Sequence, residues 1–359
     1  MKPERRSSVP VSEASLKDCD AILDTRSPAE FAEDHVPGAV SCPVLDNEER
    51  ARVGTLYKQV SPFDAKKLGA ALVARNIGFH VENTFREKPK TWRPLVYCWR
   101  GGKRSGAMAH VLREIGWDAV ALEGGYKAYR RYVVESLAAL PRKCSFTVIH
   151  GATGSGKSRL LRALGQAGAQ VLDLEELAAH RGSVLGDLPG RPQPTQKMFE
   201  SLLLGELNGF DLQKEIFVEG ESKKIGQLQI PEVLIERMRA SECLIVQAGA
   251  ETRIALLLDE YRHFFADPAT LAAQLDCLAG LHGREKIGEW KALAAAGDWP
   301  ALVARLLDEH YDAAYRRSAA RNFMRFADAS LYHVDSPQPA AFERLAGNIL
   351  RDRAVALPA

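Results

Sequence analysis

Short apolar runs alternate with longer segments of helical periodicity along the first part of the chain. Buried strands are predicted at Ala21–Leu23, Leu95–Tyr97 and Ala119–Leu122. Helical spacing of apolar residues follows at Ser61–Ile77, at Lys103–Ile115, and after a turn at Gly124-Gly125 through Val134. This α/β alternation predicts a parallel sheet covered on both faces, with ligand sites at the carboxyl ends of its strands.

The same pattern restarts after the polar segment Leu137–Ser145. Further strands are predicted at Phe146–Ile149, Gln170–Leu172, Ile216–Val218 and Leu244–Val246. From Glu251 onward the periodicity is helical, and we expect no strand there. We therefore expect one α/β domain over residues 14–137, a linker over 138–145, a second α/β domain over 146–250 and a helical region over 251–359.

Composition narrows the class of protein. The chain has 359 residues, 46% hydrophobic and 26% charged, as in a globular protein with two domains. Its formal net charge is only +2, so a nucleic-acid partner requires a local basic patch. The most apolar stretch, 243–258, is interrupted by Gln247, Glu251 and Arg253, and no apolar segment follows the basic start. We expect no membrane association and a cytoplasmic location.

The six cysteines are scattered and form neither a CxxC pair nor the spacing of a disulfide framework. This favours a reducing compartment and argues against a structural metal site.

One of these cysteines, Cys98, lies between a predicted strand and a predicted helix. The connecting loop consists of Trp99, Arg100, Gly101, Gly102, Lys103 and Arg104. Backbone N–H groups of such a loop, the amino-terminal end of the helix and three cations all favour the thiolate, which is the nucleophilic form. The alternative is an inert core cysteine, but that role requires neither the two glycines nor the cations. We therefore predict that Cys98 is catalytic.

A second loop between a strand and a helix follows the pattern G-x-x-x-x-G-K-[ST]. Its residues are Gly151, Gly154, Ser155, Gly156, Lys157 and Ser158. Such a loop binds phosphate through its N–H groups and its lysine, and the serine hydroxyl can hold Mg²⁺. Glu219 and Glu221 follow a later strand, where they either orient Mg²⁺ or water or are ordinary charges at a strand end.

Several segments resemble known families. Residues 24–31 (DTRSPAEF), 35–40 (HVPGAV), the Cys98 loop and 122–126 (LEGGY) are similar to rhodanese domains. A rhodanese-like domain followed by a P-loop domain resembles the tRNA 2-selenouridine synthase family. Further segments are similar to that family, namely 54–59 (GTLYKQ), 180–183 (HRGS) and 218–226 (VEGESKKIG).

The resemblance implies a transferase that acts on tRNA. Members of this family replace the sulfur of wobble 2-thiouridine with selenium from selenophosphate, through a geranylated intermediate made from geranyl diphosphate. It also implies that Cys98 carries selenium as an S-selanylcysteine or assists its delivery. Expected partners are tRNA and an enzyme that supplies selenophosphate. No tightly bound cofactor is expected, although Mg²⁺ could accompany the phosphorylated substrate.

Three other interpretations stay open. Cys98 and Arg104 have the C-x5-R spacing of cysteine phosphatases and arsenate reductases, although Tyr97 stands where those phosphatases carry histidine. The chain could also be a thiosulfate sulfurtransferase fused to a P-loop kinase. The third interpretation is a nucleotide-gated RNA-binding module with an inactive rhodanese scaffold.

A basic segment near the carboxyl end is a candidate tRNA contact. Residues 313–325 contain four arginines and no acidic residue, and Arg317, Arg321 and Arg325 share one face if the segment is helical. Such a stripe can follow a phosphate backbone, with Tyr311 and Tyr315 available to stack on a base. The alternative is a solvated basic face.

Overall fold

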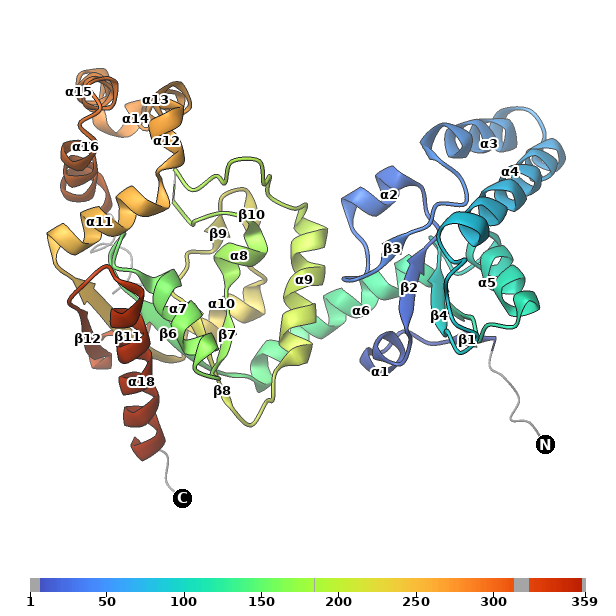
Figure 1. Cartoon of the computed structure of the whole chain (residues 1–359), viewed down its shortest axis with the longest axis horizontal. Coiled ribbons are helices and arrows are strands. Elements are labelled where there is room, and N and C mark those ends of the chain that lie inside the picture. The colour runs from blue at the N-terminus through green and yellow to red at the C-terminus, as the bar shows by residue number, and fades with distance from the viewer. Residues whose placement is uncertain (1–6, 184, 313–322, 357–359) are drawn as a thin grey trace. The chain divides into compact units, whose positions relative to one another are not determined.

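The computed structural model describes residues 7–183, 185–312 and 323–356 (Figure 1). The chain forms two compact units. Unit one comprises residues up to 136 together with 195–208, and unit two comprises 137–194 and the residues from 209 onward.

Unit one is built on a five-stranded sheet in which every pair of neighbours is parallel. Its strands follow the order β1-β5-β4-β2-β3. Their bounds are Ser8–Val9 (β1), Ala21–Asp24 (β2), Val40–Ser41 (β3), Pro94–Tyr97 (β4) and Val120–Leu122 (β5). The expected α/β fold is confirmed.

Helices surround this sheet, and several of them begin at local capping signals. Ser61, for example, accepts a hydrogen bond from the backbone N–H of Asp64 and is followed by Pro62 at the first turn of α4. The helices are α1 (Glu13–Lys17), α2 (Pro28–Glu33), α3 (Asn47–Gln59), α4 (Pro62–Asn83), α5 (Lys103–Ile115) and α6 (Gly125–Ala139). Their apolar faces cover a core that contains Leu23, Val96, Met108 and Leu112.

One helix of unit one comes from much later in the chain. Helix α9 (Gln196–Gly209) packs within this unit, where the Ser201 hydroxyl donates to Asp34 Oδ1 at 2.8 Å. Glu200 of the same helix pairs with Arg130 of α6. The sequence boundaries assigned this segment to the second domain, and the structure places residues 195–208 in the first unit.

The segment expected to be a linker is folded. Helix α6 continues to Ala139, a 3-10 turn covers Leu140–Lys143, and the next strand begins at Ser145. Pro141 and Cys144 within it are buried.

Unit two also contains a five-stranded parallel sheet, in the order β12-β11-β6-β8-β7. The strands are β6 (Ser145–His150), β7 (Gln170–Leu172), β8 (Glu215–Glu219), β11 (Glu242–Ala248) and β12 (Ser330–Val334). A short antiparallel pair, β9 (Lys224–Ile225) and β10 (Leu228–Gln229), follows β8.

The carboxyl-terminal part of the chain completes this sheet. No strand was expected after Glu251, yet β12 pairs with β11, and α18 (Pro339–Ala356) packs on α7 (Lys157–Gln166). Val334, Phe342 and Ile349 thereby join the same core as Ile149 and Leu160. The region 251–359 is therefore not an independent helical region.

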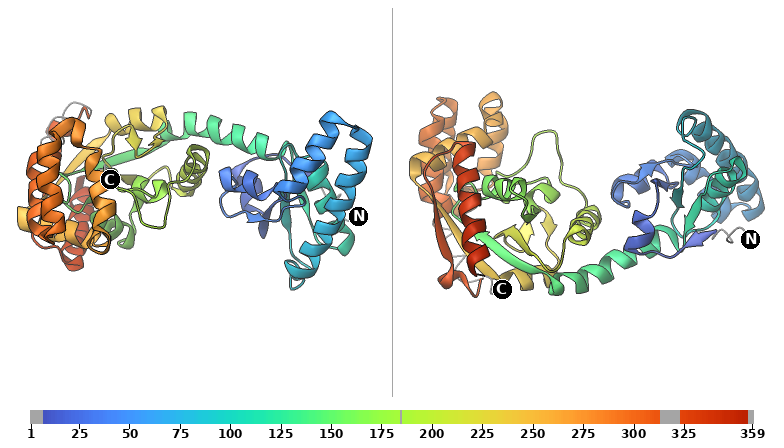
Figure 2. Two further views of the ribbon diagram at one scale, coloured as in Figure 1. Left: turned by 90° about the horizontal axis from the view of Figure 1, so that it is seen from above. Right: turned by 60° about the horizontal axis from the view of Figure 1, so that its bottom comes forward.

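The remaining helices of unit two include a group inserted between β11 and β12 (orange in Figure 2). The group has its own core around Trp290 and Leu275. Its helices are α11 (Ala250–Glu260), α12 (His263–Ala266), α13 (Pro268–Asp276), α14 (Ala279–His282), α15 (Arg284–Ala295) and α16 (Trp299–Leu306), with a π-helical turn at Leu307–Tyr311. Helices α8 (Leu174–Ala178) and α10 (Glu232–Arg239) complete the unit.

Throughout residues 7–183, 185–312 and 323–356, no helix combines the length and the apolar character needed to span a bilayer.

Candidate active sites

Cys98 lies at the carboxyl end of β4 and directly before the loop that leads to α5. Its Sγ accepts hydrogen bonds from the Gly102 backbone N–H at 3.3 Å and from the Ser105 hydroxyl at 3.2 Å. The side chain is buried, whereas Arg100, Gly101, Gly102 and Lys103 around it are exposed. The loop therefore forms the cradle of N–H groups that its sequence predicts.

The chemistry of the thiol is set by this cradle. Burial by itself raises the pKa of Cys98, but the Ser105 hydroxyl and the backbone N–H groups of Ser105, Gly102 and Arg100 outweigh it and hold the pKa below its ordinary value. Hydrogen bonding therefore favours the thiolate here, and the cations of the loop are not among the main causes.

The three loop cations have different surroundings. Arg104 Nη1 donates to Glu30 Oε2 at 2.9 Å, and although burial opposes it, Arg104 helps to lower the pKa of Glu30 to about 2. Arg104 is thus held by a carboxylate and does not clamp an anion over Cys98 as a C-x5-R arginine would. Arg100 and Lys103 are exposed and have no side-chain partner in the described part of the chain, so they can meet an anionic substrate.

A second loop fixes the shape of the first. The Tyr126 N–H donates to the Cys98 carbonyl at 2.8 Å, and a Cβ placed on Gly125 (φ +57°) would lie 2.2 Å from that carbonyl oxygen. Only glycine fits this contact. The segment 122–126, noted from its similarity to rhodanese domains, therefore shapes the cysteine loop directly.

Beneath these loops lies a buried polar group that the sequence interpretation missed. The Tyr126 hydroxyl donates to Asp34 Oδ2 at 2.8 Å, and Ser201 from α9 donates to the other carboxylate oxygen. Tyr126 also stacks on Trp99, with ring centroids 5.3 Å apart, and lies under the Arg26 guanidinium at 4.0 Å. Tyr126 was within a noted motif, but Asp34 and Ser201 carried no recognisable sequence signal.

The phosphate loop connects β6 to α7 in unit two, as its motif predicts. Gly154 and Gly156 have φ of +77° and +83°, and a Cβ on Gly156 would lie 2.5 Å from the Phe342 ring. The Lys157 ammonium donates to the Gly151 carbonyl at 2.9 Å, at the open amino-terminal end of α7. This end of a ten-residue helix supplies N–H groups and a positive dipole for phosphate.

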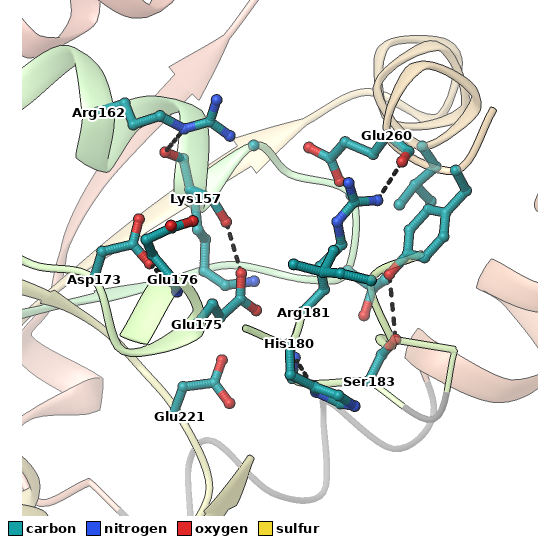
Figure 3. A pocket seen from close by; sticks show the side chains of 18 of the residues that line it. Lys157, Arg162, Asp173, Glu175, Glu176, His180, Arg181, Ser183, Glu221 and Glu260 are labelled. Atoms are coloured by element: carbon teal, nitrogen blue, oxygen red, sulfur yellow. Dashed lines mark hydrogen bonds between the residues drawn. The ribbon is translucent and has the colours of Figure 1, made fainter. Parts of the chain in front are cut away.

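This loop opens into a cavity of about 640 Å³ (Figure 3). Figure 3 shows Lys157, Asp173 and Glu175 on one side of it and Arg181, Ser183 and Glu260 on the other. The further polar side chains of its wall are Thr153, Ser158, Arg162, Glu176, His180, Glu221, Tyr261 and Tyr311. The 180–183 segment and Glu221, noted only for resemblance or for position, thus meet at the phosphate loop.

Carboxylates gather beside the lysine. Ser158 Oγ donates to Glu175 Oε2 at 3.0 Å, and the Glu175 N–H donates to Glu219 Oε1 at 2.8 Å. Burial raises the pKa of Glu221 to about 8, aided by the neighbouring charge of Glu175, and burial also raises the pKa values of Glu219 and Glu175. The Glu219 Oε2 atom is buried and has no hydrogen-bond partner in the described chain. Glu221 lines the cavity, whereas Glu219 supports Glu175 from behind.

These donors suit a divalent cation held together with phosphate. A serine hydroxyl and carboxylate oxygens are ligands that Mg²⁺ prefers, and the crowding of negative charge would be relieved by a cation. A compact set of three or more His, Cys, Asp or Glu ligands is not found in the described residues, so Ser158 and Glu175 would share the ion with substrate oxygens.

The candidate tRNA contact is only partly described. Arg325 pairs with Glu242 at 3.0 Å, as the solvated-face alternative would have it, while Arg317 and Arg321 lie outside the described residues. Tyr311 lines the phosphate cavity, and Tyr315 lies outside the described residues.

Two family models match the chain. A rhodanese-like domain matches residues 11–132, and the tRNA 2-selenouridine synthase AAA domain matches residues 144–278.

Curated relatives match both parts together. Proteins named tRNA 2-selenouridine synthase from Nitrosomonas europaea, Nitrosomonas eutropha and Hydrogenovibrio crunogenus are 36%, 37% and 36% identical, each over 67% of this chain. The matches cover 63%, 62% and 67% of those proteins, so this chain spans somewhat less than two thirds of the length of the first two.

Proposed function

Because this chain belongs to the tRNA 2-selenouridine synthase family, we propose that it replaces the sulfur of a wobble 2-thiouridine in tRNA with selenium. The observation that carries the proposal is the Cys98 sulfur, hydrogen-bonded and biased toward the thiolate, in one chain with a phosphate-binding cavity. The enzyme is then a transferase with two sites, one in each unit, and its partners are tRNA and an enzyme that supplies selenophosphate.

The phosphate loop serves the first step. The sulfur of 2-thiouridine attacks C1 of geranyl diphosphate, the carbon–oxygen bond breaks, diphosphate leaves and the N3 proton of the base passes to solvent. Lys157 and the N–H groups at the start of α7 stabilise the departing negative charge. Mg²⁺ at Ser158 and Glu175 would add further positive charge at the diphosphate.

Cys98 serves the second step as a nucleophile. Its thiolate adds at C2 of the base and the bond to the geranylated sulfur breaks, so that geranylthiol leaves after taking a proton. The selenium of selenophosphate then displaces the Cys98 sulfur, and water cleaves the phosphorus–selenium bond to release phosphate and 2-selenouridine. Exposed Arg100 and Lys103 are placed to attract the anionic selenophosphate.

Displacement at C2 of the base by Cys98 is favoured over an S-selanylcysteine because it needs no oxidant. Selenium in selenophosphate is at the oxidation level of selenide, and an S-selanylcysteine at Cys98 would require a two-electron oxidant. Displacement at C2 requires none. Mass spectrometry of the Cys98 peptide distinguishes the routes, because one leaves a trapped nucleoside adduct and the other an added selenium.

Nucleoside mass spectrometry of 2-thiouridine tRNA, after incubation with the protein, selenophosphate and geranyl diphosphate, tests the function. We expect 2-selenouridine with the wild type and with Cys277→Ser, an exposed cysteine that serves as control. Cys98→Ser is expected to accumulate the geranylated nucleoside without selenation. Selenouridine formed at the wild-type rate by Cys98→Ser would overturn the role of Cys98, and its absence with the wild type would overturn the function.

A further inference from the structure

A second cavity lies beside the phosphate-binding one and has the opposite character. It measures about 50 Å³, and helices α11, α12, α13 and α16 contribute to its wall side chains such as Leu258, Phe264, Trp299, Leu302 and Val303. Its wall is aliphatic or aromatic apart from the hydroxyls of Thr153, Tyr261 and Tyr311 and the indole N–H of Trp299. An apolar cavity of this kind stays dry and accepts an apolar group.

The two cavities share part of their walls. Four residues line both: Thr153 of the phosphate loop, Leu257 of α11, Tyr261 directly after α11, and Tyr311 of the π-helical turn. The Tyr261 and Ser183 hydroxyl oxygens are 3.3 Å apart, and burial raises the pKa of both tyrosines, so they stay neutral. A single ligand can therefore place phosphate groups on Lys157 and an uncharged end beyond these tyrosines.

We propose that the second cavity binds the apolar end of the phosphorylated substrate held by the phosphate loop and that its size limits the length of that end. The assignment rests on the proposed function and deepens it by locating the tail and limiting its length. A nucleoside end is disfavoured because a base and a ribose would bury several polar groups against a wall with almost no partners.

The volume of the second cavity limits the length of the apolar chain that it can hold. One water-sized group needs about 10–15 Å³ of such volume, so 50 Å³ holds about four. This matches the terminal five-carbon unit of an isoprenoid chain and leaves no room for another. A chain one isoprene unit longer than geranyl is therefore expected to fit less well.

Calorimetric titration of the full chain tests the assignment. We expect geranyl diphosphate to bind at least tenfold more tightly than inorganic diphosphate, and farnesyl diphosphate to bind more weakly than geranyl diphosphate. Val303→Phe, which fills the second cavity, should remove the advantage of the geranyl chain and leave the affinity for inorganic diphosphate unchanged. Ala304→Phe, on the same helix but lining neither cavity, should keep the advantage.

Each result has a separate meaning. Equal affinity of the wild type for geranyl and inorganic diphosphate would overturn the tail site and leave the phosphate role standing. Retention of the geranyl advantage in Val303→Phe would overturn it as well. Binding of neither ligand would overturn the phosphate role itself, and with it the tail site. Should thermal unfolding show Val303→Phe to be misfolded, the wild-type comparison of the three ligands still decides.

Discussion

Replacing Ser105 with alanine tests the origin of the Cys98 reactivity. The change deletes a buried hydroxyl whose oxygen lies 3.2 Å from the Cys98 sulfur, and it adds no bulk. A hydrogen bond to a charged group contributes about 1.5–3 kcal/mol. Because the backbone N–H of Gly102 still donates, the lower end applies, and about 1.4 kcal/mol is a tenfold change in an equilibrium. The thiolate population of Cys98 at a fixed pH below its pKa should therefore fall about tenfold.

Alkylation by iodoacetamide, followed on the Cys98 peptide by mass spectrometry across a pH series, measures this change. The thiolate reacts and the thiol does not, so a higher pKa moves the rate profile toward alkaline pH. Ser105→Thr keeps a hydroxyl and should keep the profile, and exposed Cys277 provides an internal reference that neither variant should alter. A profile identical to that of the wild type in Ser105→Ala would refute the hydrogen-bond explanation and return the role to the loop cations.

Further predictions concern both units. Lys157→Ala should raise the dissociation constant for geranyl diphosphate at least tenfold, about 1.4 kcal/mol, in direct titration. Ser201→Ala should lower the free energy of unfolding in urea by about 1–3 kcal/mol, because it leaves buried Asp34 one donor short. The stability that the protonated Glu221 carboxyl contributes is present below its unfolded pKa of 4.5 and is lost as the pH rises to about 8, so Glu221→Gln should be more stable than the wild type above pH 8, by thermal unfolding. If the basic segment binds RNA, replacing three of its arginines with alanine should weaken tRNA binding, namely Arg317, Arg321 and Arg325. The slope of log affinity against log salt concentration should also become shallower, by up to about 0.9 per lost phosphate contact.

The elements that local sequence determines were predicted well. Helix α5 was expected at Lys103–Ile115 and is found there, because a buried strand, a glycine pair and a regular apolar face mark its start and course. The phosphate loop likewise lies between a strand and a helix, since its glycines and Lys157 are adjacent in sequence. In both cases the signal and the structure occupy the same few residues.

Strand β12 was not predicted from the sequence because it lies at the edge of its sheet. Of Ser330–Val334 only Val334 is buried, so the segment shows neither an apolar run nor a clear alternation. It becomes a strand by pairing with β11, whose partner residues are about 86 positions earlier in the chain, as Leu244 with Ser330 shows. Long-range pairing of this kind leaves little trace in the local sequence.

The N–H groups around Cys98 were predicted, whereas the stabilisation of the thiolate expected from the loop cations is not among the main causes, for a similar reason. The loop sequence shows Arg104 six residues after Cys98 but not Glu30, which lies 74 residues before Arg104 and holds it. It also gives no reason to single out Ser105, one serine among many, as a donor to sulfur. Charge can be counted along a sequence, whereas the direction of a side chain depends on the packed fold.

Helix α9 links the two halves of the sequence, because it is encoded after the phosphate loop and packs in unit one. The chain leaves unit two after residue 194, contributes α9 to unit one and returns at residue 209. Within unit one, the hydroxyls of Ser201 in α9 and of Tyr126 both donate hydrogen bonds to the Asp34 carboxylate. The backbone N–H of Tyr126 in turn donates to the carbonyl of Cys98. The loop that carries the nucleophile therefore depends on a segment encoded within the P-loop half. Two independent modules joined end to end would need no such exchange, whereas unit one of this chain is completed by a helix that follows the phosphate loop in the sequence.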